Sequence, residues 1–124
     1  MAIEKIVVVE DDMIIQMFIA RVLQTAGFKV VGEARKCSQV LIIVEETKPD
    51  LILMDIGLSG DKDGIETAEI LMEKFDIPII FITGNSDAYT LNRAKKVNPV
   101  GIIFKPIDEN QLRERIINFR DERA

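Results

Sequence analysis

The sequence of 124 residues contains no histidine and only one cysteine, Cys37. The lack of histidine excludes catalytic triads and general bases built on imidazole, and it excludes histidine-based zinc sites. A single cysteine cannot form a disulfide within the chain, and no segment resembles a secretory signal, so we expect a reducing, cytoplasmic setting. Any chemistry must therefore use carboxylates, hydroxyls and lysines, and any phosphohistidine must belong to a partner.

Long apolar runs and excess positive charge are also missing. Runs such as Val40–Val44 are far shorter than the roughly 20 residues that a membrane-spanning helix needs, so we expect no insertion into a membrane. The 16 basic and 21 acidic residues give a net charge of −5. Without a broad positive field, direct binding of nucleic acid is not expected. The length suits one domain, residues 1–124, with one hydrophobic core.

Short apolar runs rich in β-branched residues recur along the chain and predict strands. The later ones are apolar on consecutive residues, which is typical of parallel strands that are covered on both faces. The predicted strands are Lys5–Val9, Phe28–Val31, Leu51–Met54, Ile79–Ile82 and Val100–Phe104.

The segments between these runs show helical periodicity. In the first, the predicted buried stripe is Ile15, Phe18, Ile19, Val22 and Ala26, and Asp63 is placed to cap the third. The fourth has few and small apolar residues, so we expect it to be the least firmly anchored helix. Alternating strands and helices predict an α/β fold with helices on both faces of the sheet. The predicted helices are residues 12–26, 38–47, 64–75, 86–97 and 108–121.

Polar side chains stand where four of the predicted strands end, and ligands of open parallel sheets bind beyond those ends. Each has an ordinary structural explanation on its own, such as a helix cap for Asp11 or Asp12 and a turn for Asp55. Their convergence on one edge is better explained by a site. The residues are Glu10, Asp11 and Asp12 after the first strand, Asp55 after the third, Thr83 after the fourth and Lys105 after the fifth.

Carboxylates gathered at one sheet edge repel each other, and a cation relieves that repulsion. An oxygen-only set suits Mg²⁺ (or Mn²⁺), which takes one or two carboxylates and a phosphate oxygen. With a metal and a lysine to neutralise charge on the transferring oxygens, a carboxylate can attack a phosphoryl group. The residues thus favour metal-assisted phosphoryl transfer to an aspartate.

Four segments, in chain order, resemble the signature segments of response-regulator receiver domains of two-component signalling. The resemblance spans the whole chain and implies a flavodoxin-like (βα)5 fold, with a parallel five-stranded sheet of order 2-1-3-4-5. It implies a function in phosphorelay signal transduction, in which the domain catalyses only its own phosphoryl transfer and dephosphorylation and is not otherwise an enzyme. The segments are Val7–Asp12, Leu51–Ile56, Ile79–Gly84 and Phe104–Pro106.

The same resemblance implies a role for each matching residue. Asp55 is expected to accept the phosphoryl group from a sensor histidine kinase or a histidine phosphotransfer protein. Thr83 and Lys105 are expected to bind that group, with the Lys105–Pro106 bond cis. The expected metal ligands are Asp11 directly, Glu10 largely through water, Asp55, and the backbone carbonyl of Gly57.

The chain departs from the common pattern of the family in three places. The loop after Asp55 is one residue longer than usual, with Ser59 where proline is frequent. Gly57 and Asn85 occupy places that tune the rate of dephosphorylation. Ile102 stands where an aromatic switch residue is common, and a β-branched isoleucine cannot copy the movement of a ring. We expect Ile102 to pack as a strand residue and the loop after Thr83, with the fourth helix, to carry the switch.

Apolar residues near the start of the first helix, Met13, Ile14 and Met17, lie off its predicted buried stripe. We expect part of this surface to stay exposed and to dock the helices of the phosphodonor, although these residues could instead complete the core. The expected output is a shifted surface of the fourth helix, fifth strand and fifth helix. A downstream protein target, an output domain in a longer protein and a homodimer all stay open as partners.

Two other classes share part of this pattern. Haloacid-dehalogenase-like phosphatases combine an aspartyl nucleophile, Mg²⁺, a threonine and a lysine, but their nucleophile ends the first strand, where this chain has Glu10. A flavodoxin that holds FMN would need a glycine- and hydroxyl-rich phosphate loop after the first strand. The acidic residues at that place would repel the phosphate. Both alternatives are therefore disfavoured.

Overall fold

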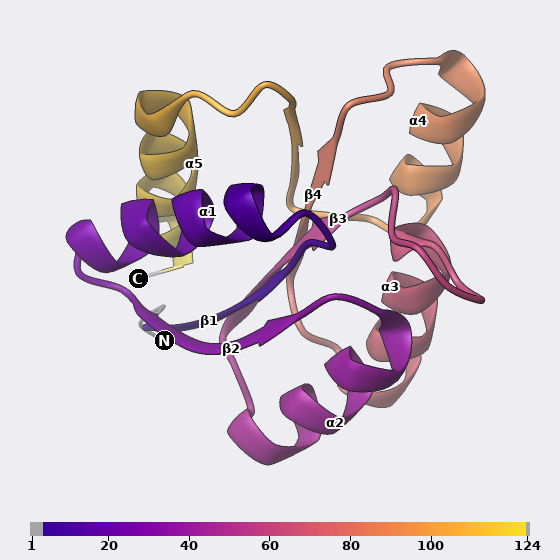
Figure 1. Cartoon of the computed structure of the whole chain (residues 1–124), viewed down its shortest axis with the longest axis horizontal. Coiled ribbons are helices and arrows are strands. Elements are labelled where there is room, and N and C mark those ends of the chain that lie inside the picture. Colours follow the sequence, from indigo (N-terminus) through magenta and orange to yellow (C-terminus); the bar gives the residue numbers. More distant parts are fainter. Residues whose placement is uncertain (1–3, 124) are drawn as a thin grey trace.

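One parallel sheet forms the centre of the computed structural model, which describes residues 4–123 (Figure 1). Its strand order is β2-β1-β3-β4-β5, which confirms the predicted order and the α/β fold. The strands are β1 (Lys5–Val9), β2 (Lys29–Ala34), β3 (Leu51–Asp55), β4 (Ile79–Thr83) and β5 (Gly101–Phe104).

Within residues 4–123, five helices cover the two faces of the sheet. The core on one face contains residues of α1 and α5, and the core on the other contains residues of α2, α3 and α4. Figure 1 shows this division, with the sheet between the two groups of helices. The helices are α1 (Met13–Thr25), α2 (Cys37–Thr47), α3 (Gly64–Lys74), α4 (Ala88–Lys96) and α5 (Glu109–Arg123).

The strands differ in how fully they are covered. Every residue of β3 and β4 is buried, as expected for central parallel strands. The same expectation for the fifth strand is wrong, because β5 lies at the sheet edge and Phe104 is 46% exposed. The second strand is longer than predicted. It extends to Ala34 because β2 keeps pairing with β1 as far as Val9, after a register shift near Ile6.

Aspartate side chains cap the starts of α1, α3, α4 and α5; at α5, Asp108 accepts from the backbone N–H groups of Asn110 and Gln111. Asp12 accepts from the backbone N–H groups of Ile14 and Ile15 at the start of α1. Asp63 and Glu66 form a reciprocal capping box at the start of α3, which confirms the predicted cap. Asp87 caps α4. Asp12 and Asp87 follow the ends of β1 and β4 by a short loop each, so they fix helix starts beside the polar edge of the sheet.

The buried face of α1 differs from the predicted stripe. Ile19 and Val22 are buried as expected, but Phe18 is 38% exposed and Gln16 is buried in its place. The amide of Gln16 donates to the backbone oxygens of Glu10 and Ala34, at the ends of β1 and β2. These two hydrogen bonds turn the Gln16 face of the helix toward the sheet, and an apolar stripe could not reveal them.

The fourth helix is weakly buried. Ala94 is the one buried residue that α4 contributes among those described, and Leu91 is half-buried. The helix therefore has less apolar anchorage than α1 or α3, in line with its small apolar residues. No helix within residues 4–123 is both long and apolar enough to cross a membrane.

Candidate functional site

The carboxyl ends of four strands meet in one cavity of about 500 Å³. Glu10 follows β1, Asp55 and Thr83 end β3 and β4, and Lys105 follows β5. The strand register explains their proximity, because Asp55 pairs with Ile82 and Thr83 pairs with Phe104. The predicted convergence of these polar side chains is confirmed.

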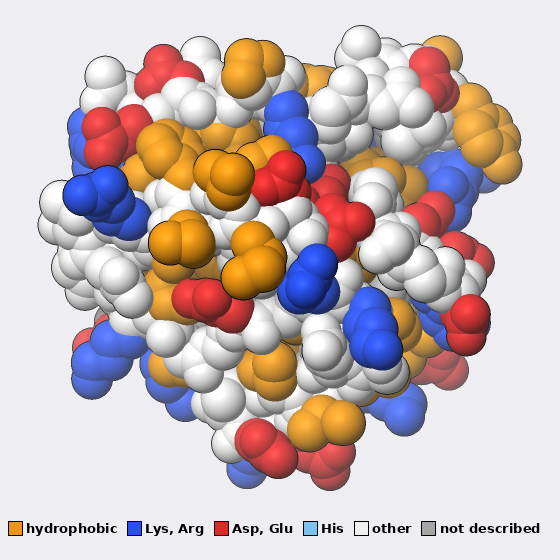
Figure 2. All heavy atoms as spheres, in the orientation of Figure 1, with side chains coloured by type: hydrophobic (Ala, Val, Ile, Leu, Met, Phe, Trp, Pro, Cys, Tyr) orange, Lys and Arg blue, Asp and Glu red, His pale blue; other side chains and the backbone are white. Residues whose placement is uncertain are grey.

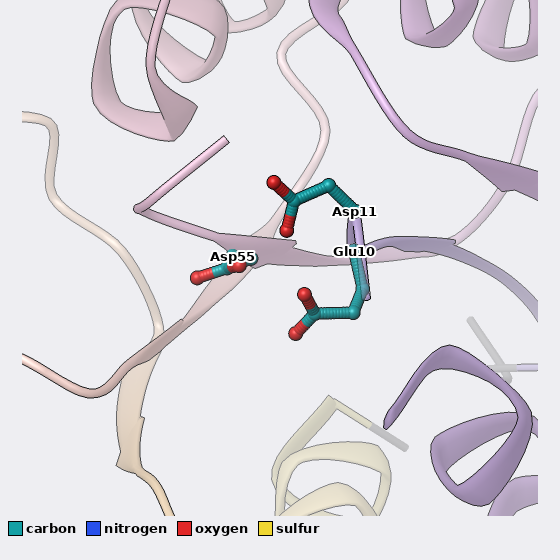
Figure 3. A group of neighbouring side chains, drawn as sticks. All are labelled: Glu10, Asp11 and Asp55. Carbon is teal, nitrogen blue, oxygen red and sulfur yellow. The ribbon is translucent and has the colours of Figure 1, made fainter. Parts of the chain in front are cut away.

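Three carboxylates form a cluster in this cavity. Glu10, Asp11 and Asp55 each offer an oxygen, and these oxygens all lie within 4.8 Å of one another. Glu10 is fully buried and Asp55 is 4% exposed, whereas Asp11 is half-buried. Figure 3 shows the three side chains turned toward a common space.

Asp55 is held by contacts to both of its carboxylate oxygens. Oδ1 accepts a hydrogen bond of 3.1 Å from the backbone N–H of Gly57, and Oδ2 lies 3.3 Å from Nζ of Lys105. Gly57 itself lines the cavity. The carboxylate is thus oriented by the loop on one side and by a cation on the other.

Glu10 is a buried acid in an unusual environment. Its Oε2 accepts from the backbone N–H of Asp12 at 3.1 Å, and its Oε1 lies 2.9 Å from Nζ of Lys105. This ion pair lacks the geometry of a hydrogen bond, so Oε1 is buried without a hydrogen-bond partner among the described residues. Burial raises the pKa of Glu10 to about 7 and outweighs the lowering effects of Asp12 and Lys105.

Lys105 is the cation that joins two of the acids. Burial opposes its charge, but the close contact with Glu10 and the negative charge of Asp55 together raise the pKa of Lys105 above its usual value. Its backbone N–H donates to the carbonyl of Thr83 at 2.8 Å. The Lys105–Pro106 peptide bond is cis, as expected. Lys105 therefore stays charged beside the carboxylate that it contacts.

Thr83 is buried in the cavity wall at the end of β4, and its hydroxyl is hydrogen-bonded to the loop that follows this strand. It donates to the carbonyl of Asn85 at 3.1 Å and accepts from the backbone N–H of Asn85 at 3.0 Å. Ile102 does not line the cavity. It pairs with Phe81 in the sheet and is half-buried against the core cluster that contains Ala94, so it packs as the strand residue we expected.

The arrangement fits a hard divalent cation. The donor atoms are all oxygens, two of the carboxylates are buried, and one buried oxygen lacks a hydrogen bond. A cation placed among them would relieve their mutual repulsion and complete the coordination of Glu10. Carboxylate oxygens of this kind suit Mg²⁺ or Mn²⁺.

Two charged residues of the cavity wall were not predicted as part of the site. Asp63, which was predicted only as a cap, and Arg93 of α4 both line the cavity, and their side chains form an ion pair of 3.0 Å. The sequence places Arg93 on the polar side of a weak helix, and nothing in its spacing points toward the site. Only the packing of α4 beside the start of α3 brings the two together.

The residues proposed for partner docking lie beside the cavity. Met13, Ile14 and Met17 are 56%, 79% and 64% exposed, which confirms that this surface is not part of the core. Figure 2 shows apolar side chains gathered over α1, next to a group of acidic ones. We call Met13, Ile14, Met17 and Phe18 the α1 patch. A pocket of about 310 Å³ between Ile14, Phe18 and Pro106 connects this patch to the segment after Lys105.

Comparisons with known proteins agree on one family. A family model described as the response regulator receiver domain matches residues 6–117. The transcriptional regulatory protein PdtaR of Mycobacterium tuberculosis is 30% identical over 108 residues, covering 87% of this chain and 52% of PdtaR. The phyllosphere-induced regulator PhyR of Methylorubrum extorquens is 33% identical over 103 residues, covering 82% of this chain and 38% of PhyR.

Solved structures give the same result. The signal receiver domain of a modulated diguanylate cyclase from Desulfovibrio desulfuricans superposes with a TM-score of 0.87 at 32% identity, covering 98% of this chain and 99% of that domain. A CheY-like receiver domain protein from Methanospirillum hungatei gives a TM-score of 0.88 at 25% identity, with 98% and 96% covered. The chain spans about half the length of PdtaR, the curated relative named first.

Proposed function

The chain belongs to the response regulator receiver domain family, and we propose that Asp55 is the residue on which it is phosphorylated. Phosphorylation of an aspartate and binding of Mg²⁺ are general features of this family, which serves two-component signalling. One observation carries the assignment. Asp55 is the buried carboxylate at the end of β3 that contacts both Lys105 and the backbone of the following loop, inside an acidic cluster.

The transfer can be written from the residues present. An oxygen of the Asp55 carboxylate attacks the phosphorus of a phosphohistidine, and the P–N bond breaks as the new P–O bond forms. The electron pair of the broken bond stays on the imidazole nitrogen of the donor. Lys105, already beside Asp55, neutralises charge on the transferring oxygens, and the Thr83 hydroxyl can donate to one of them once it leaves Asn85.

Glu10, Asp11, Asp55 and the backbone carbonyl of Gly57 would hold Mg²⁺ in the same pocket. When bound, the ion would stabilise the negative charge on the oxygens of the transferring phosphoryl group. Asp11 supports direct ligation because it is half-buried and faces the cavity, while Glu10 lies deeper and is occupied by Lys105. This arrangement supports the division of roles expected from the sequence.

We also infer that the α1 patch receives the phosphodonor, a sensor histidine kinase or a histidine phosphotransfer protein. Receiver domains interact with histidine kinases, and a donor must bring its phosphohistidine to Asp55 in the cavity. The patch borders that cavity, since Ile15 of the same helix lines it, and the pocket between Ile14 and Pro106 could seat an apolar side chain of the donor.

We propose that phosphorylation shifts the surface formed by α4, β5 and α5, and that this surface passes the signal on. The curated relatives are longer than this chain, so an output domain in the same protein and a separate protein target remain two routes for the signal. The exposed side chains of Phe104 on β5 and Tyr89 on α4 offer contact area on this surface.

The experiment is to treat the protein with a small phosphodonor and Mg²⁺ and to measure its intact mass. We expect one added phosphoryl group in the parent protein and none in Asp55→Asn or without Mg²⁺. Asp76→Asn is a matched control, because Asp76 is exposed and has a positive φ that asparagine also accepts. Labelling of Asp55→Asn at the parent level would overturn the assignment.

A further inference from the structure

The fourth helix is connected to the site at its N-terminal end by a chain of hydrogen bonds. The Thr83 hydroxyl donates to the carbonyl of Asn85, and the side chain of Asn85 accepts from the backbone N–H of Asp87. Asp87 in turn accepts from both the backbone N–H and the hydroxyl of Thr90. A change in the hydroxyl of Thr83 therefore reaches the first turn of α4 through three residues.

One turn further along, α4 has a second connection to the site. Nη1 of Arg93 lies 3.0 Å from Oδ2 of Asp63, the residue that caps α3. The other carboxylate oxygen of Asp63, Oδ1, accepts a hydrogen bond from the backbone N–H of Glu66. The ion pair therefore joins α4 to the start of α3 across the wall of the phosphorylation cavity.

The start of α3 is packed tightly against the end of β3. The backbone N–H of Gly64 donates to the carbonyl of Ile56 at 2.8 Å, and this glycine has no room for a side chain against Asp55. α4 has no comparable anchorage, since Ala94 is its one buried residue. The Arg93–Asp63 pair thus joins a helix with one buried residue to a helix that buries several.

We propose that the ion pair between Arg93 and Asp63 is a restraint that holds α4 in its resting position and opposes its displacement when Asp55 is phosphorylated. Arg93 is then a positioning residue that acts through α4 and the loop after Thr83. This inference rests on the proposed function of Asp55, because the displacement that it opposes is the one driven by the phosphoryl group.

The size of the effect follows from the exposure of the pair. The two side chains are 30% and 28% exposed, so the contribution is that of a surface ion pair and changes an equilibrium by about 2- to 5-fold. A change of about 2- to 5-fold would hardly alter the position of a helix that is well packed against the core. It matters in α4, where one buried alanine is the main competing anchor.

The test begins with hydrogen exchange of the unphosphorylated protein. We expect exchange in residues 88–97 to be about 2- to 5-fold faster in both Arg93→Ala and Asp63→Asn, and no faster in the double variant than in either one. Asparagine keeps the helix cap while it removes the charge, so exchange in α3 should stay at the parent rate. Lys95→Ala, an exposed change on the same helix, is the control and should leave α4 unchanged.

The second measurement links the restraint to the phosphorylated state. The affinity for beryllofluoride, a phosphoryl analogue, should rise in Arg93→Ala by about the same factor, because less restraint opposes the displaced state. The proposed restraint would be wrong if α4 of either single variant exchanged at the rate of the parent protein. It would also be wrong if the effects of the two substitutions added up in the double variant. Failure of Asp55 labelling in the parent protein would count against the proposed function instead, while the exchange of the resting protein would still decide the restraint.

Discussion

The α-carbon of Gly64 lies so close to Asp55 that a β-carbon added at residue 64 would stand 2.0 Å from the backbone oxygen of Asp55. Helix α3 therefore begins in direct contact with the end of β3. The backbone hydrogen bond from Gly64 to Ile56 closes the same contact. The position of Asp55, the proposed phosphoacceptor, thus depends on a glycine that follows it by nine residues.

Gly64→Ala should destabilise the fold, because the added methyl group would clash with the backbone of Asp55 and Ile56. The clash can be relieved only by moving the start of α3 or the end of β3, which carries Asp55. We expect a loss of about 1–3 kcal/mol in the free energy of unfolding, measured with chemical denaturant, and slower phosphorylation by a small donor. Gly84→Ala is the control, since its nearest neighbour would be 3.8 Å away, in ordinary contact. Equal stability of the two variants would show that the contact at Gly64 is not restrictive.

Asp11→Ala should weaken Mg²⁺ binding at least about tenfold, because it removes a carboxylate that faces the cavity and offers an oxygen to the acidic cluster. Titration calorimetry of the unphosphorylated protein measures the affinity. Asp12→Asn is the matched control, because Asp12 is exposed and asparagine can keep its cap on α1. An Mg²⁺ affinity in Asp11→Ala equal to that of the parent would remove Asp11 from the ligand set.

Ile14→Lys and Met17→Lys should each slow phosphoryl transfer from the histidine partner by about fivefold or more, because a charge would be buried against the donor. Phosphorylation by a small donor should be unchanged, since neither side chain lines the cavity. Ile42→Lys provides the control for a new surface lysine, because Ile42 is 59% exposed on α2. Equal losses with both donors would point to misfolding instead of lost docking.

Thr83→Ala should reduce the response of residues 84–97 to a phosphoryl analogue, because it removes the hydroxyl that links the site to Asn85. Ile102→Val should keep most of that response, since Ile102 packs outside the cavity. Hydrogen exchange with and without beryllofluoride compares the two variants. Loss of the response in Ile102→Val to the same extent as in Thr83→Ala would contradict a switch carried by the loop.

Much of the fold and the centre of the site could be predicted because they depend on local patterns. Asp55 and Thr83 end apolar runs, and parallel strands carry such residues to one edge whatever the details of packing. The buried face of α1 was predicted less well. Phe18 was placed in the core and Gln16 was not, because the hydrogen bonds that turn α1 go to the ends of two different strands.

The sequence by itself determined the succession of strands and helices along the chain, the residues at the strand ends and the absence of histidine chemistry. These properties follow from composition and from periodicities of a few residues. The tertiary structure alone decided that Arg93 meets Asp63 and that α3 begins against Asp55. Such contacts join elements far apart in the chain, and their existence depends on the distance and angle at which helices pack, which no local pattern contains.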